Sequence, residues 1–222
     1  MAEFDYTGWV ARAQAFMSGL GSLSYTEVRS AAVTAPATEA DMQALERELG
    51  RTIPFSLRTF FTRAASGLDC RYTMPPEGQD LDKLRDVLPD VSRIYGGPRL
   101  GPVSELADFS RAVREWADET WVAEFPEERR IWDSALPFIR LDNGDYLALD
   151  LRAIETDPPV VYLSHDDESF LLSPDFVAFL SAWERLCYIG PEHWLLSEFA
   201  GAGGYLDPDS DRASQLRGLF VG

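Results

Sequence analysis

The residues best able to do chemistry lie together in the short segment SHDDES, Ser164 to Ser169. One histidine, His165, is followed by the carboxylates Asp166, Asp167 and Glu168, and an apolar run precedes them. A histidine among carboxylates could bind a divalent metal or take part in acid–base catalysis. The same composition is typical of a solvated loop between a strand and a helix, and we favour that interpretation.

The rest of the chain offers few groups that could complete a catalytic site. It contains two histidines and two cysteines, and His193, Cys70 and Cys187 are well separated from His165 in the sequence. There is no glycine-rich phosphate loop, no His-Glu-x-x-His motif and no Cys-x-x-Cys pair. Two cysteines are too few for a disulfide framework, so we expect two buried thiols. We therefore expect no enzymatic activity, no catalytic or metal-binding residues and no cofactor.

Acidic residues dominate the charge: 37 aspartates and glutamates against 20 lysines and arginines give a formal net charge of −17. Nine carboxylates, Glu155 among them, lie from Asp142 to Asp175, where Arg152 is the only arginine or lysine. Such a chain repels nucleic acid and anionic membranes and associates quickly with a basic partner. Solubility alone explains the acidity equally well.

Several of these carboxylates fall in predicted turns at strand ends, where side chains are exposed. Two tyrosines on the polar side of their strands could add anchor contacts, although cross-strand packing is an equal alternative for both. The residues we expect to contact a partner are Asp142, Asp145, Tyr146, Tyr162, Asp166, Asp167 and Glu168.

In the first half of the chain, apolar spacing predicts a helix over 6–20 and then a helix hairpin. Thr38 and Asp41 form a capping-box pattern, and Gly50 suits the end of that helix. A second helix follows Ile53-Pro54, with Ser56 as its N-cap. Residues 25–33 could be a strand or a connection, and CRYTM could be a strand. We expect IYGGPRLGP to be a loop, residues 104–122 to form a helix with Trp116 on its apolar side, and EFPEERR to be a break.

In the second half, LPFIRLDNGDYLALDL predicts strand, turn and strand, because Asn-Gly between apolar runs is a strong hairpin signal. Tyr146, Ala148 and Asp150 alternate with leucines, so we expect the leucines to face the core. VVYLSH predicts a third strand, and Ser173-Pro174 is expected to begin a helix that continues to Cys187.

In this order, three segments resemble the SUKH superfamily, which contains fungal regulators of cell-wall synthesis and many bacterial immunity proteins. ATEADMQALERELGRTIPFSLRTFFTRAASG is similar to the opening helix pair of that family. LPFIRLDNGDYLALDL and PVVYLSHDDESFLLSPDFVAFLSAW are similar to its hairpin and to its next strand and closing helix. The resemblance covers residues 37–67 and 136–184 and departs at Ser66, where the family usually has asparagine.

The resemblance and the local signals together predict an α+β fold, with a mostly antiparallel sheet and helices packed against it. We expect an N-terminal helical extension at residues 1–36 and a SUKH-like domain at residues 37–189. Residues 190–222 would form a C-terminal extension packed on or beside that domain.

The resemblance implies a function through protein–protein contact. We expect an immunity protein that binds and neutralises a cognate bacterial toxin domain, for example a nuclease. The alternative is a regulatory interaction scaffold of the cell-wall-synthesis-regulator type, and an enzyme built on SHDDES is a third class. One tight partner would indicate immunity, many weak partners would indicate a scaffold, and bound metal would indicate an enzyme.

The expected location is the cytoplasm. No apolar run approaches the length of a membrane span, and Glu3 and Asp5 stand where a signal peptide would carry positive charge. We therefore expect no membrane or nucleic-acid partner, and the sequence sets no oligomeric state.

Overall fold

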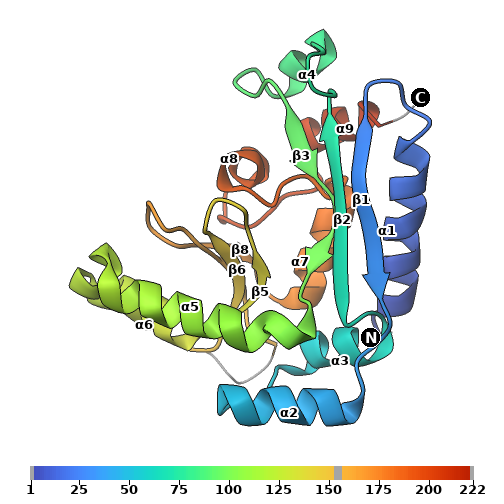
Figure 1. The fold of residues 1–222 in the computed structure, drawn as a ribbon. Coiled ribbons are helices and arrows are strands. Elements are labelled where there is room, and N and C mark those ends of the chain that lie inside the picture. The colour runs from blue at the N-terminus through green and yellow to red at the C-terminus, as the bar shows by residue number, and fades with distance from the viewer. Residues whose placement is uncertain (1–2, 153–156, 221–222) are drawn as a thin grey trace.

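The computed structural model describes residues 3–152 and 157–220, which form two four-stranded antiparallel sheets with helices packed around them (Figure 1). The strands are β1 Glu27–Thr34, β2 Gly67–Met74, β3 Ile94–Gly96, β4 Arg99–Leu100, β5 Ala135–Arg140, β6 Tyr146–Asp150, β7 Val160–Leu163 and β8 Phe170–Ser173. The α-helices are α1 Tyr6–Leu20, α2 Glu39–Leu49, α3 Phe55–Arg63, α4 Asp82–Val87, α5 Leu106–Glu119, α6 Pro126–Ser134, α7 Phe176–Arg185, α8 His193–Leu196 and α9 Asp211–Gly218. Short 3₁₀ turns are η1 Val103–Glu105, η2 Trp121–Glu124 and η3 Ser197–Phe199. The predicted α+β class with antiparallel strands is confirmed, although the strands are divided between two sheets.

The first sheet is built around β2, which pairs with β1 on one side and with β3 and β4 on the other. The segment over residues 25–33, left open above, is largely strand β1. The expectation that IYGGPRLGP is a loop is wrong, because it supplies β3 and β4. Gly97 joins these two strands with φ of 117°, and a Cβ there would lie 2.0 Å from the Cys70 carbonyl oxygen.

The second sheet has the order β5-β6-β7-β8 and begins with the predicted hairpin. Gly144 in its Asn-Gly turn has φ of 98°, a conformation that glycine adopts without steric cost. The predicted alternation is wrong, because Tyr146, Ala148 and Asp150 are as buried as the leucines between them. Helices cover both faces of the sheet: Phe109 of α5 packs on Tyr146, and Phe176 of α7 packs on β5.

The helix hairpin α2–α3 has the predicted cap and one unexpected start. The Thr38 hydroxyl accepts from the Asp41 backbone N–H, and the Asp41 carboxylate accepts from the Thr38 N–H at 2.8 Å, so the capping box is confirmed. Ser56 is not an N-cap, because α3 already begins at Phe55. The Ser56 hydroxyl instead donates to Asp157 at 2.7 Å and ties the first turn of α3 to the chain before β7.

Two further boundaries differ from prediction. The expected break at EFPEERR contains most of α6, a short helix that begins with Pro126 and buries only Glu128 and Trp132. Helix α7 begins after Asp175, whose carboxylate accepts from the Ala178 N–H at 2.7 Å, so Ser173-Pro174 is not its start. Ser173 belongs to β8, an unpredicted strand.

The two sheets and both ends of the chain share one hydrophobic core. The Gly101 N–H beside β4 donates to the Phe138 carbonyl of β5 at 2.8 Å. Helix α7 lies between the sheets in Figure 1, and its Leu180 carbonyl accepts from the Trp9 indole of α1 at 3.0 Å. Near the C-terminus, Phe220 packs on Tyr72 of β2. The division of the chain at residues 37 and 189 therefore stays a prediction.

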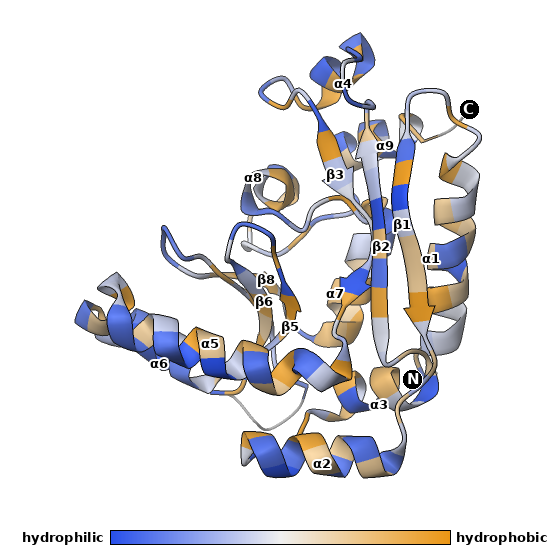
Figure 2. Cartoon of the chain, viewed as in Figure 1, coloured by the Kyte–Doolittle hydropathy of each residue, from blue (hydrophilic) through white to orange (hydrophobic). Residues whose placement is uncertain are grey.

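The length and polarity of the helices show whether any of them could cross a membrane. Among the helices in the described part of the chain, none combines the length and apolarity needed to cross a membrane. The bands of hydrophilic and hydrophobic colour along α2 and α5 in Figure 2 are those of amphipathic helices with one side on the core.

Candidate functional site

The predicted partner-binding residues gather where the strands of the second sheet end. The β5–β6 turn carries Asp142 and Asp145, and the loop between β7 and β8 carries Asp166, Asp167 and Glu168. Both connections are hydrophilic and lie on the same side of the molecule in Figure 2. SHDDES joins two strands and not a strand and a helix, because β8 follows it directly.

Asp145 connects the two acidic segments. One carboxylate oxygen accepts from the His165 backbone N–H at 2.9 Å and lies 2.6 Å from His165 Nδ1. The other oxygen accepts from the Asn143 side-chain amide at 2.6 Å and from the Tyr162 hydroxyl. Burial alone would raise the pKa of Asp145, but the hydrogen bonds from Tyr162, His165 and Asn143 outweigh it and lower that pKa. Asp145 is therefore ionised, and its hydrogen bonds join the β5–β6 turn to β7 and the β7–β8 loop; we call this set of hydrogen bonds the brace at Asp145.

Three of the predicted partner residues are consequently not exposed. Asp145 is 3%, Tyr146 5% and Tyr162 0% accessible. Tyr146 packs under Phe109, and Tyr162 stacks on Phe170 at 4.9 Å between ring centroids. The expectation of exposure fails for all three because helices and the neighbouring loop cover the strand faces that were expected to be polar. These side chains are therefore part of the packing beneath the exposed loop residues.

Both ring nitrogens of His165 lie close to carboxylate oxygens. Its Nδ1 faces Asp145, and its Nε2 lies 3.0 Å from an Asp166 oxygen. An aspartate–histidine pair can orient a general base, but Nε2 faces Asp166, and the nearby Ser164 hydroxyl is buried and accepts from the Asp167 N–H at 3.1 Å. Among the described residues, no group of three or more histidine, cysteine, aspartate or glutamate side chains is arranged to hold a metal ion. The pair holds the loop in place.

The loop is also tied to the helical side of the sheet. Glu128 of α6 accepts from the Ser169 N–H at 3.0 Å, and the Trp132 indole donates to the Ser169 hydroxyl at 3.1 Å. The Trp121 indole donates to the His165 carbonyl at 2.9 Å. Both ends of the loop are thus anchored, while Asp166, Asp167 and Glu168 between them remain exposed.

Asp142 is exposed but its charge is already paired. One oxygen lies 3.1 Å from Arg71 of β2 and the other 3.4 Å from Arg99 of β4. These contacts link the hairpin of the second sheet to the first sheet, beside a groove of about 600 Å³ lined also by Asp69 and Arg140. Asp142 thus contributes less free negative charge than the β7–β8 loop. Glu155, also counted in the acidic stretch, lies outside the described residues.

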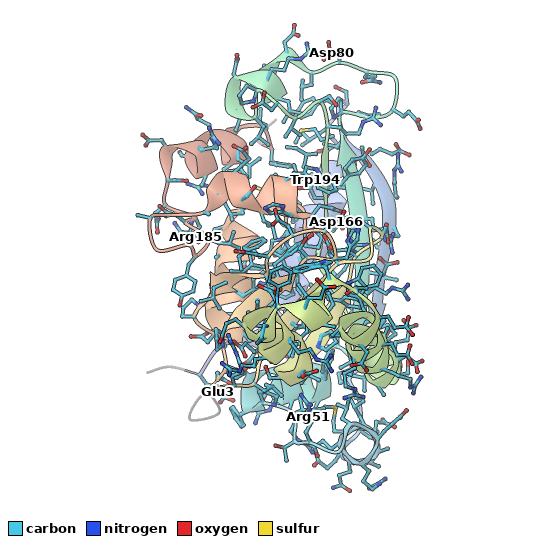
Figure 3. The ribbon with its side chains drawn as sticks, turned by 90° about the vertical axis from the view of Figure 1, so that its left-hand side faces the viewer. Glu3, Arg51, Asp80, Asp166, Arg185 and Trp194 are labelled. Carbon is cyan, nitrogen blue, oxygen red and sulfur yellow. The ribbon has the colours of Figure 1, made fainter. Side chains whose placement is uncertain are left out.

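Exposed aromatic side chains flank the loop, and their exposure was not predicted from the sequence. Trp116, expected on the buried side of its helix, is 38% exposed at the end of α5, and its ring contacts His165 at 5.9 Å between centroids. Phe125 before α6 is 53% exposed. Trp194 of α8 is 49% exposed and lies on the same face as Asp166 (Figure 3). No periodic signal marks these residues, because apolar spacing alone predicts burial.

The candidate site thus combines anchored acidic loop residues with exposed aromatic rings. The chain belongs to the SMI1/KNR4 family (SUKH-1), whose model matches residues 36–182. The match spans both acidic connections, α5 and α6. A comparison with curated proteins found no match.

Proposed function

We propose that this protein is an immunity protein, which binds a cognate bacterial toxin domain and neutralises it. Members of its family are generally non-enzymatic immunity or regulatory proteins, which supports a role in binding. The observation that carries the proposal is the anchored β7–β8 loop, which presents Asp166, Asp167 and Glu168 to solvent from a rigid base.

Electrostatics favours a toxin with a basic surface. With a net charge of −17, the protein attracts such a surface before contact, and complementary charges can raise association rate constants to about 10⁸ M⁻¹s⁻¹ at low salt. A nuclease is a fitting target, because its substrate groove is basic and carboxylates can occupy phosphate positions there. The toxin would meet this protein in the cytoplasm, where we place it.

Co-expression tests the proposal. Toxin-like domains encoded by the genes adjacent to this one are induced in a sensitive bacterium with and without this protein. Survival that requires this protein, with co-purification of the two chains at nanomolar affinity, is the expected result. Death in both cultures would contradict the proposal for this toxin, and a pull-down with many weak partners would favour the regulatory scaffold.

Charge reversal tests the surface. The loop variant carries Asp166→Lys, Asp167→Lys and Glu168→Lys. The control variant carries Glu77→Lys, Asp86→Lys and Asp90→Lys, which are exposed residues in and around α4. Both variants change the net charge equally, and α4 lies at a distant end of the molecule (Figure 1). We expect the loop variant to lose affinity for the toxin domain, and equal affinities would reject this surface.

A further inference from the structure

A cluster of aromatic side chains borders the acidic loop and leaves two rings open to solvent. Trp116 contacts the His165 ring, and the Trp121 indole donates to the His165 carbonyl at 2.9 Å. Trp121 in turn packs on Phe125, with ring centroids 5.6 Å apart. The cluster therefore reaches from α5 across the base of the loop to the start of α6, with Trp116 and Phe125 as its exposed ends.

Four exposed carboxylates lie within a few residues of this cluster, or of the His165 that it contacts, along the chain. Glu119 lies three residues after Trp116, Glu124 directly precedes Phe125, and Asp167 and Glu168 follow His165. None of these four forms an ion pair with another residue in the described part of the chain. Arg129, the first arginine of α6, is already paired with Asp118 at 2.6 Å and with Asp133 at 2.9 Å.

We propose that Trp116 and Phe125 are the apolar anchors of the partner-binding surface, and that the partner is a protein with an apolar pocket bordered by lysine or arginine. This inference rests on the proposed function and specifies the chemistry of the partner. Charge complementarity favours a basic partner, because any protein that covers these rings must also approach the four free carboxylates. An acidic or neutral partner would bury them without compensation.

The two kinds of residue contribute to different steps of binding. The carboxylates accelerate association over a range limited by ionic screening, whereas buried aromatic anchors slow dissociation. Trp116 and Phe125 suit the second task, since aromatic side chains have few rotatable bonds and lose little entropy when covered. Their neighbours His165 and Trp121 are already held by hydrogen bonds, which keeps the cluster rigid.

The test uses variants of the whole chain and a catalytically inactive form of the toxin domain that the co-expression test identifies. Trp116→Ala and Phe125→Ala are each expected to weaken binding tenfold or more, mainly through faster dissociation. Phe55→Ala is the matched control, because Phe55 is an exposed phenylalanine, 69% accessible, at the start of α3. Phe125→Leu, which keeps apolar area, should recover part of the lost affinity. Thermal unfolding confirms that each variant is folded.

Ionic strength distinguishes the contribution of the aromatic anchors to affinity from the contribution of the charges. Affinities are measured at low and at high ionic strength for the alanine variants and for the loop variant Asp166→Lys, Asp167→Lys, Glu168→Lys. The loss caused by Trp116→Ala and Phe125→Ala should persist at high salt, whereas the loss caused by charge reversal should shrink. Affinities within twofold of wild type for both alanine variants at both salt concentrations would overturn the inference.

The outcomes distinguish this inference from the proposed function. If wild-type protein binds the toxin domain and the alanine variants bind equally well, the anchors are wrong and the immunity function stands. An equal loss for Phe55→Ala would likewise overturn the assignment of the surface. If wild-type protein shows no binding, the proposed function and the inference fail together.

Discussion

At the scale of single residues, Asp145 determines how the candidate surface is held. Its carboxylate is inaccessible and accepts from Asn143, Tyr162 and His165, so it links the β5–β6 turn to the β7–β8 loop. A buried carboxylate with several donors is costly to remove, because each donor is left without a partner. The loop carboxylates of the surface depend on this inaccessible one for their position.

We predict that Asp145→Asn lowers the free energy of unfolding by about 2 kcal/mol, because the amide replaces one acceptor by a donor that faces other donors. Urea denaturation followed by tryptophan fluorescence measures the change. The exposed Asp86→Asn serves as the control, with an expected change within about 0.5 kcal/mol. Equal stability of Asp145→Asn and wild type would show that the brace is not needed.

The lowered pKa of Asp145 makes stability depend on acidity. The pKa of Asp150 is lowered in the same way. Burial alone would raise this pKa, but the hydrogen bonds from Arg152 outweigh the effect of burial. A carboxyl whose pKa is lower folded than unfolded contributes its full stability above its unfolded value of about 3.9 and loses it as the pH falls through the folded value. We predict that the free energy of unfolding falls as the pH drops below about 4. The fall should be shallower in Asp145→Asn, and identical pH profiles would contradict this account.

At the scale of elements, the sequence predicts features that depend on adjacent residues, and it misses short elements that depend on pairing or packing with other segments. The capping box at Thr38 and the turn at Gly144 were predictable, because each depends on a few adjacent residues. The strands β3, β4 and β8 span only two to four residues, too few for a local period to reveal them, and β3 and β4 also depend on pairing with the more distant β2. Helix α6 escaped prediction because charge dominates its sequence.

Gly97 shows how a distant partner constrains a short element. We predict that Gly97→Ala costs about 3 kcal/mol or more, because the new Cβ meets the Cys70 carbonyl in addition to the strain of positive φ. Gly78→Ala is the control, since Gly78 also has positive φ, 79°, but no neighbouring atom within 4 Å of the added Cβ. It should cost only about 1 kcal/mol. Equal melting temperatures for the two variants would exclude the predicted overlap.

At the scale of the whole molecule, the packing of the elements determines which predicted site residues are exposed and unpaired, and so able to contact a partner. Composition directed attention to the acidic connections, but it could not show that helices cover the second sheet on both faces and bury Tyr146 and Tyr162. Nor could it show that Asp142 is engaged by two arginines of the other sheet. Exposed Trp116 and Phe125 were missed for the same reason, because exposure depends on how elements far apart in the chain meet.

The surface proposed for toxin binding combines contributions from the whole fold. The β7–β8 loop supplies the charges, α5 and the connection between α5 and α6 supply the aromatic rings, and the brace at Asp145 fixes the loop. Asp166 and the exposed Trp194 also lie on one face of the molecule in Figure 3. Neutralisation by contact would therefore require the assembled fold.

Survival of toxin-expressing cells is the most direct test of this account. Cells that produce the toxin domain receive wild-type protein, the variant Asp166→Lys, Asp167→Lys, Glu168→Lys, or the control Glu77→Lys, Asp86→Lys, Asp90→Lys, at matched levels. We predict survival with wild type and with the control, and death with the loop variant. Equal survival with all three proteins would show that the β7–β8 loop is not the neutralising surface, and death with all three would contradict the immunity function itself.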